Sequence, residues 1–165
     1  APFYSFYSNY LKANGFSTTS IGFLWSVGVI AEIIMFAYAT FFLKKLSWRV
    51  LVSICLQMTG LRFIIAGSFP NSFSAQFLSQ TMHAFSFGLF HMIAMRIIFQ
   101  NFTAGQQGRG QALYSTMWGL GVASGSLLAG HYWQSLGGEM IFKLAGCSII
   151  FGLFLVKALP SKIQA

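Results

Sequence analysis

The stretch that decides the fold is residues 20–43, SIGFLWSVGVIAEIIMFAYATFFL, in which a single charged residue, Glu32, interrupts an otherwise uncharged run. A run of this length suffices for a transmembrane helix, which needs about 20 mostly apolar residues to cross a hydrocarbon core of about 30 Å. Comparable runs follow along the chain. The sequence therefore predicts a membrane protein that carries an ionisable group inside one of its spans.

The composition excludes a water-soluble protein. Hydrophobic residues make up 56% of the chain and charged residues 7%, and the mean hydropathy is +0.67. A soluble domain carries roughly 25% charged residues. The net charge of +8 does not indicate a nucleic-acid partner, because no basic and aromatic surface is left to form one.

The apolar runs predict an all-α transmembrane helix bundle of six spans within one domain, residues 1–165. The expected spans are residues 1–13, 20–43, 48–68, 72–99, 111–133 and 140–159. The first is too short to cross a bilayer at 1.5 Å per residue. It also begins at Ala1 without an initiator methionine, so we expect a truncated first helix in a piece of a longer protein.

The basic residues predict an orientation. If the first helix begins on the cytoplasmic side, the inner loops and tail collect seven of the ten Lys and Arg residues: Lys44, Lys45, Arg49, Arg96, Arg109, Lys157 and Lys162. Lys12 and Lys143 fall outside, and Arg62 lies within a span. This asymmetry agrees with the positive-inside rule. We therefore expect both ends of the chain to face the cytoplasm, as in a bacterial inner-membrane protein.

Two charged residues are expected at membrane depth. Glu32 lies about midway along its span, and its neighbours are apolar. Intramembrane carboxylates are costly and usually mark substrate or ion pathways, so Glu32 is a candidate for proton or substrate handling. Arg62 lies in the outer half of the third span, where its planar guanidinium is a candidate ligand for an anionic substrate or a carboxylate. The alternative for Glu32 is a purely structural ion pair with an arginine on another helix, and the alternative for Arg62 is snorkelling outward. From their depth and sign we expect the two charges to pair.

The fourth span carries further polar candidates. Gln80, His83 and Ser86 recur at three-residue spacing, so they form a polar strip on one helix face. On an ideal α-helix His91 lies about 80° and about 12 Å from His83. The two histidines therefore do not share a metal ion, and no metal site is expected. His83 is a candidate proton relay, and His91 is a weaker one.

Weaker signals come from the first, second and fifth spans. Tyr4, Tyr7 and Trp25 are candidates to line a pocket for an organic solute; the alternative is that they face lipid or pack in the core. In the fifth span small residues recur at four-residue spacing, and they predict close helix packing. The packing residues are Gly121, Gly125, Ser126 and Gly130.

The sequence resembles the C-terminal half of a major facilitator superfamily transporter. The basic loop KKLSWR at residues 44–49 resembles the cytoplasmic loop motif of that superfamily in degraded form. The segments YSFY (4–7), residues 22–28, MHAFSFG (82–88) and GRGQALYS (108–115) are similar to the phenylpropionate permease family. This family is related to lactose permease and to nucleoside proton symporters, and the resemblance covers essentially the whole chain.

The resemblance to lactose permease extends to single positions. Arg62 and His83 match its third-span arginine and fourth-span histidine. Its sugar-binding glutamate falls at Val29, one turn before Glu32, and its coupling carboxylate falls at Ser86, which does not titrate. The resemblance therefore implies that proton coupling uses Glu32, a histidine or the missing half.

The function implied is proton-coupled uptake of a small organic solute, such as 3-phenylpropionate or a related aromatic acid. A nucleoside or sugar symporter is the alternative within the superfamily. A polytopic membrane enzyme or a structural membrane subunit is the alternative of another class. The chain has no HExxH, GxSxG or paired carboxylates, so no enzyme activity is expected. No cofactor is expected beyond protons as coupling ion, and the expected partners are the bilayer, the solute and the missing half.

Overall fold

The computed structural model describes residues 1–158, in which every element is helical. The end of the last expected span, Leu159, and Lys162 lie outside the described residues. The elements are α1 (Pro2–Ala13), α2 (Thr18–Lys45), α3 (Trp48–Ser68), α4 (Phe73–Thr81), the π-helix η1 (Ala84–Leu89), α5 (Phe90–Asn101), the 3-10 turn η2 (Ala104–Gln106), α6 (Gln107–Cys147) and α7 (Ile149–Ala158). The expected all-α class is confirmed.

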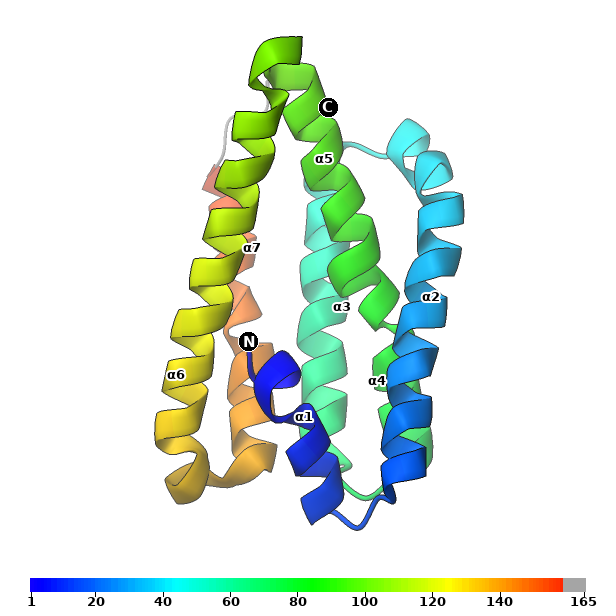
Figure 1. Ribbon diagram of the computed structural model, residues 1–165, viewed down its shortest axis with the longest axis vertical. Helices are drawn as coiled ribbons and strands as arrows, with labels where there is room; N and C mark the ends of the chain where they lie inside the picture. The colour runs from blue at the N-terminus through cyan, green and yellow to red at the C-terminus, as the bar shows by residue number, and fades with distance from the viewer. Residues whose placement is uncertain (159–165) are drawn as a thin grey trace.

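Four helical segments in this range are long and apolar enough to cross a membrane. They are Thr18–Lys45, Trp48–Ser68, Phe73–Asn101 and Ala104–Ala158. The third joins α4, η1 and α5 into one rod, so the expected span 72–99 corresponds to three consecutive helical elements. The chain is a multi-pass membrane bundle whose helices run roughly parallel to one long axis (Figure 1).

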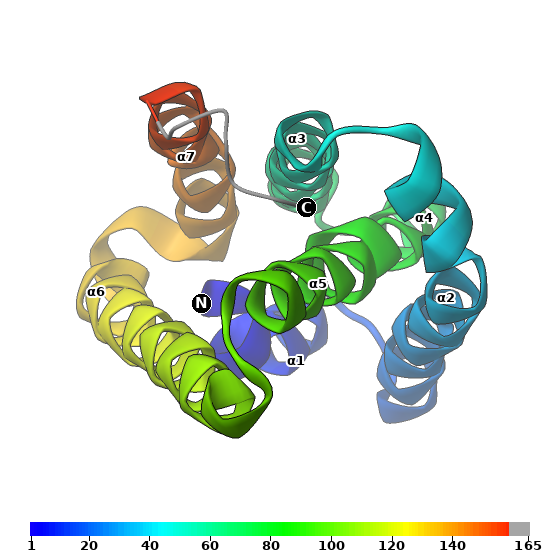
Figure 2. The ribbon, with the colours of Figure 1, turned by 90° about the horizontal axis from the view of Figure 1, so that it is seen from above.

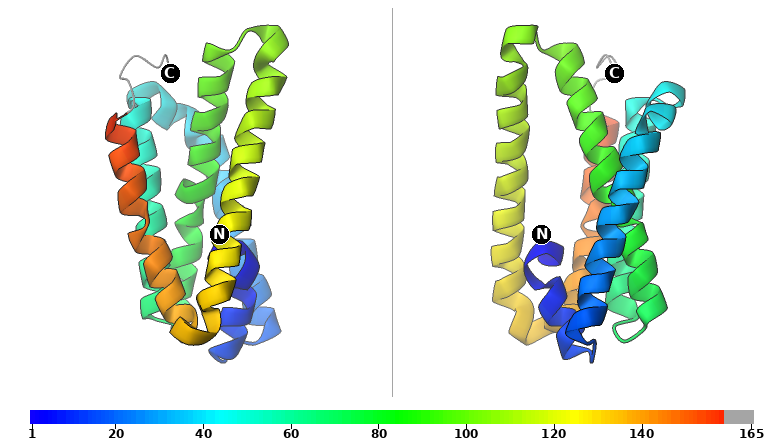
Figure 3. Two further views of the ribbon diagram at one scale, coloured as in Figure 1. Left: turned by 90° about the vertical axis from the view of Figure 1, so that its left-hand side faces the viewer. Right: turned by 45° about the vertical axis from the view of Figure 1, so that its right-hand side comes forward.

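The fourth segment contains a reversal of direction at Gly137. This residue has φ 75°, inside α6, a left-handed conformation that glycine adopts readily. The chain turns back there, and its second arm, residues 138–147, continues into α7 (Figure 3). The expected spans 111–133 and 140–159 begin in the first and second arms respectively.

Helix α1 lies at the centre of the bundle when seen along the helices, between the α6 and α7 pair and the group formed by α2 to α5 (Figure 2). Its aromatic face packs into a core with Leu24, Phe63 and Phe142. Tyr10 donates a hydrogen bond to the carbonyl of Ala66 in α3 at 2.9 Å. Packing and hydrogen bonds together hold α1 against α3.

Close helix packing depends on glycines that the sequence analysis did not single out. A Cβ atom at Gly67 of α3 would lie 2.6 Å from the carbonyl oxygen of Glu139, and one at Gly146 would lie 2.8 Å from that of Gly60. The backbones of α3 and the second arm of α6 therefore approach too closely for any side chain at these positions.

The predicted small residues of the fifth span face α1 in part. Ser126 forms a hydrogen bond with Ser5 at 2.7 Å. A Cβ atom at Gly125 would clash with the side chain of Ala1, and one at Gly130 would lie 3.3 Å from Phe6. A Cβ atom at Gly121 would meet nothing within 4 Å. Gly121 instead lines a cavity.

Candidate functional site

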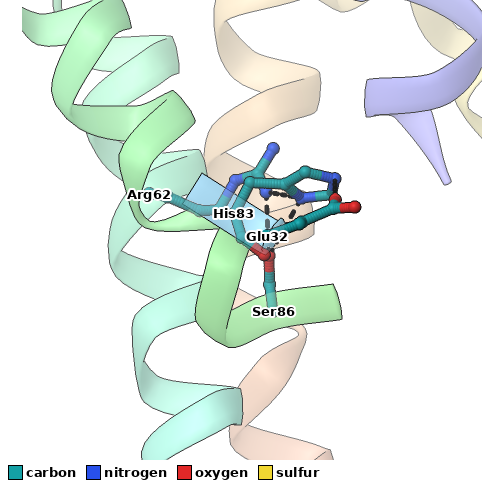
Figure 4. Close-up of polar contacts among 4 residues, drawn as sticks. All are labelled: Glu32, Arg62, His83 and Ser86. Carbon is teal, nitrogen blue, oxygen red and sulfur yellow. Dashed lines mark hydrogen bonds and ion pairs between the residues drawn. The ribbon is translucent and has the colours of Figure 1, made fainter. Parts of the chain in front are cut away.

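Three elements bring Glu32, Arg62, His83 and Ser86 together in the middle of the bundle (Figure 4). Nε2 of His83 lies 2.7 Å from Oε1 of Glu32. Arg62 donates from Nη1 to Nδ1 of His83 and to Oγ of Ser86, the latter at 2.8 Å. We call Glu32, His83 and Arg62 the central triad.

The contacts of the triad define the state of the imidazole. An arginine has no acceptor, so Nδ1 of His83 accepts the hydrogen bond from Arg62. A neutral imidazole with an acceptor at Nδ1 carries its hydrogen on Nε2, and that hydrogen is donated to Glu32. His83 is thus a neutral bridge between a carboxylate and a guanidinium.

This arrangement corrects one expectation. Glu32 and Arg62 do not form a direct ion pair: within residues 1–158, Glu32 makes its ion-pair contact with His83. The expectation considered depth and charge, and these do not show that a third polar residue occupies the space between two helices.

Two glycines let α2 reach the triad. A Cβ atom at Gly28 would lie 2.8 Å from Oε1 of Gln80, and one at Gly88 would lie 3.4 Å from Met35 and 3.7 Å from the Cα atom of Glu32. The backbone of α2 therefore packs closely against α4 and η1. Without this approach, the short carboxylate side chain of Glu32 would not reach His83.

Arg62 is buried and only partly satisfied. Its exposed fraction is 1%, and its guanidinium carbon lies 4.2 Å from the ring centroid of Phe3 and 5.1 Å from that of Phe63. Cation–π contacts of this kind stabilise a desolvated cation. Nε and Nη2, however, have no hydrogen-bond partner in the described part of the chain. Buried polar groups are normally paired, so these two N–H groups are unsatisfied donors that call for an explanation.

Two cavities adjoin the triad. The first has a volume of about 570 Å³ and is mostly apolar, with Arg62, His83 and Ser86 as its polar points near Phe3 and Tyr4. The second has a volume of about 320 Å³. Its lining consists of Tyr4, Trp25, Val29, Glu32, His83, Phe87, Trp118 and Val122.

The weaker candidates fall into two groups. Tyr4 lines both cavities, and Trp25 lines the second, where its indole donates to Oγ of Ser8 at 3.0 Å. Tyr7 and Gln80 line neither cavity and are buried. Tyr7 donates to Oε1 of Gln76 at 3.1 Å, so its hydroxyl belongs to a core network.

A π-helix lies between His83 and His91, where the sequence analysis assumed a continuous α-helix. Phe87 stacks on both rings, with centroids 5.9 Å from His83 and 5.8 Å from His91. The expected displacement of about 80° assumes 3.6 residues per turn, whereas η1 takes more residues per turn. The phenyl ring still separates the histidines. Nδ1 of His91 lies 3.3 Å from the hydroxyl oxygen of Tyr114. His91 is therefore not part of the triad.

The sequence analysis missed three aromatic residues of the site: Phe3, Phe87 and Trp118. Phe3 lies against Arg62, and Phe87 and Trp118 form walls of the second cavity. Phe87 lies four residues from each histidine, a spacing that places side chains on one helix face. That spacing was the available signal for Phe87.

These features define a class of protein: a multi-pass membrane protein with a buried polar triad beside a cavity between its helices. Comparisons with known proteins agree. The family model described as MFS_1 like family matches residues 1–144, so this chain belongs to that family, within the major facilitator superfamily of transporters.

One curated relative supports the same assignment. The chain is 31% identical over 166 residues to a protein of Escherichia coli (strain K12) named "Probable 3-phenylpropionic acid transporter". The match covers 98% of this chain and 42% of the relative, so the chain spans less than half the length of that protein. No solved structure matches this chain significantly.

Proposed function

We propose that this chain forms part of a proton-coupled symporter that takes up a small aromatic acid, such as 3-phenylpropionate, by alternating access. The observation that carries the proposal is the buried guanidinium of Arg62, whose Nε and Nη2 have no partner among the described residues and which lines a largely apolar cavity of about 570 Å³. A solute that fits both features has an apolar body and a carboxylate.

The carboxylate would bind Arg62. Charge-assisted hydrogen bonds from a guanidinium to a carboxylate are short and often bidentate, and Arg62 has two N–H directions left for them. Phe3 and Phe63, which also line the first cavity, lie against the guanidinium and help to hold it. An acid therefore gains both a counter-ion and an apolar surrounding, whereas a sugar or nucleoside would leave the guanidinium without an anion.

Proton coupling follows from the bridge that His83 makes. Nδ1 can accept a proton only when Arg62 stops donating to it. A substrate carboxylate that draws Arg62 away exposes Nδ1, and the resulting imidazolium is held by Glu32 through Nε2. Anion binding and proton uptake then favour each other, and linkage requires that the effect be reciprocal. Two sites that favour joint occupation give symport.

The whole transporter would provide the rest of the pathway. Substrate sites in this superfamily lie at the interface of two six-helix halves, so we propose that a further half faces the two cavities. The end of α2, the start of α3, the end of α5 and the start of α6 lie toward the same end of the bundle (Figure 1), and these segments carry Lys44, Lys45, Arg49, Arg96 and Arg109. By the positive-inside rule this end is cytoplasmic, in the inner membrane of a bacterium.

The experiment uses the complete protein that contains this chain, produced in de-energised cells. Solutes are added in turn to a lightly buffered suspension, and the external pH is followed. The panel contains 3-phenylpropionate, benzoate, uridine and lactose, with a strain lacking the protein and a protonophore as controls. We expect alkalinisation with 3-phenylpropionate that both controls abolish.

Each result has a distinct meaning. Alkalinisation with uridine or lactose, and none with the acids, would replace the proposed substrate class and retain symport. Accumulation of labelled 3-phenylpropionate without a pH change would retain the substrate and refute proton coupling. If no solute of the panel enters cells that contain the inserted protein, the proposal fails.

A further inference from the structure

The two cavities share part of their lining. Three residues line both: Tyr4 of α1, His83 and Trp118 of α6. His83 belongs to the triad, and Tyr4 and Trp118 are aromatic. Trp118 comes from a helix that contributes nothing to the triad, so its place beside both cavities needs a separate explanation.

The surroundings of Trp118 are aromatic on several sides. Its ring lies 5.6 Å from that of Phe87, 6.3 Å from that of Tyr4 and 6.5 Å from that of Tyr114, measured between centroids. The side chain is half-buried. Its indole N–H has no hydrogen-bond partner within residues 1–158. Trp118 therefore offers a ligand a flat apolar surface and an unused donor.

Neither Arg62 nor the volume of the first cavity selects an aromatic solute. A guanidinium binds any carboxylate, and an apolar cavity accepts saturated and aromatic groups alike. Aromatic rings that meet in edge-to-face or offset geometry attract each other beyond the effect of their buried area, which is equivalent to roughly 2- to 12-fold in affinity. Selection for a ring thus requires an aromatic wall, and the wall common to both cavities contains Trp118.

We propose that Trp118 is a specificity-determining residue whose indole holds the aromatic ring of the substrate while Arg62 holds its carboxylate. This inference rests on the proposed function, because it takes an organic acid as the solute. It adds a preference for planar aromatic acids over saturated acids of the same carbon skeleton.

The test compares two acids in the complete protein: 3-phenylpropionate and 3-cyclohexylpropionate. They share the carboxylate and the carbon count and differ in the aromaticity and planarity of the ring. KM is measured for both in the parent, in Trp118→Leu and in Trp118→Phe, with each protein level normalised by immunoblot. Trp133→Leu is the matched control, because Trp133 stacks on Phe6 at 4.7 Å and lines neither cavity.

We expect the parent and Trp133→Leu to prefer 3-phenylpropionate, Trp118→Phe to keep most of this preference, and Trp118→Leu to lose it, a change of roughly 2- to 12-fold in the KM ratio. Where the leucine variant does not reach the membrane, Trp118→Met replaces it, since methionine fills irregular space well. An unchanged ratio in an inserted Trp118→Leu or Trp118→Met protein overturns the inference and leaves acid transport standing. If the parent carries neither acid, both the inference and the proposed function fail.

Discussion

Nε2 of His83 lies 2.7 Å from Oε1 of Glu32, while Nδ1 of the same ring receives a hydrogen bond from Arg62. One neutral imidazole therefore separates the intramembrane carboxylate from the buried cation. A direct salt bridge between Glu32 and Arg62 would neutralise both charges without leaving a site for a proton. The bridge instead links the protonation state of the His83 imidazole to the binding of a ligand at Arg62.

Replacing Glu32 by Gln tests this connection. The glutamine oxygen can still accept the hydrogen from Nε2 of His83, so the geometry persists while the negative charge is lost. We expect uptake driven by an imposed proton gradient to fall by at least about tenfold, within the range typical of coupling between two sites. Exchange of labelled for unlabelled 3-phenylpropionate across proteoliposomes should continue, because exchange needs no net proton movement. Equal loss of uptake and exchange would contradict the assignment of Glu32 to coupling.

Replacing Arg62 by Lys tests the anion site. Lysine keeps a positive charge but loses the planar fork and its fit over the Phe3 ring. We expect KM for 3-phenylpropionate to rise by roughly 10- to 100-fold, the equivalent of about 1.5–3 kcal/mol for hydrogen bonds to a charged group.

Arg96→Lys is the matched control for that variant. Arg96 donates to the carbonyl of Leu43 and lies outside both cavities. The KM of Arg96→Lys for 3-phenylpropionate should therefore stay within about twofold of the parental value, as expected for an interaction distant from the site. The anion-site assignment is wrong if Arg62→Lys retains the parental KM at a normal protein level.

The membrane fold could be predicted from the sequence because hydrophobic length alone carries that information. The all-α class follows from the apolar runs, and the choice of Glu32, Arg62 and His83 as candidates follows from ionisable residues inside them. The expected pair of Glu32 and Arg62 was wrong in its detail, since depth and sign do not reveal the order of side chains across an interface. The spacing of residues along a single helix predicts which side chains share a face, whereas contacts between helices depend on tertiary packing.

The π-helix marks the second limit of prediction. MHAFSFG at residues 82–88 has no proline and no break in hydrophobicity, so ideal α geometry is the natural expectation, whereas the structure has the π-helix η1 there. Close packing at Gly67 and Gly146 was also missed. Those glycines do not recur at four-residue spacing within one helix; each meets the backbone of another segment, a relation that a one-dimensional pattern does not contain.

Helix packing gives a prediction on stability. In Gly67→Ala the new methyl group would lie 2.6 Å from the carbonyl oxygen of Glu139, a backbone atom that cannot rotate away. Overpacking typically costs about 1–3 kcal/mol. We expect the melting temperature of Gly67→Ala in detergent to lie several degrees below that of the parent. It is measured by fluorescence-detected size exclusion after heating. Gly121→Ala is the control, since a Cβ atom there meets nothing within 4 Å; equal melting of the two variants would contradict the packing assignment.

The π-helix gives the last prediction. Removing one residue from η1, as in deletion of Phe85, should let the α-type hydrogen-bond ladder reform while α4 and α5 keep their own contacts. The stack of His83, Phe87 and His91 would then be lost.

We expect the deletion protein to insert in the membrane and to transport 3-phenylpropionate at least about tenfold more slowly, because the coupling geometry at His83 changes. Phe85→Ala separates the loss of a side chain from the loss of the π-turn, since it keeps the chain length, and it should transport at a rate near the parental one. Circular dichroism and immunoblots confirm folding and protein level in both variants. If the deletion protein transports as fast as Phe85→Ala, the π-helix is not needed for function, and its position beside His83 reflects packing between α2 and η1 alone.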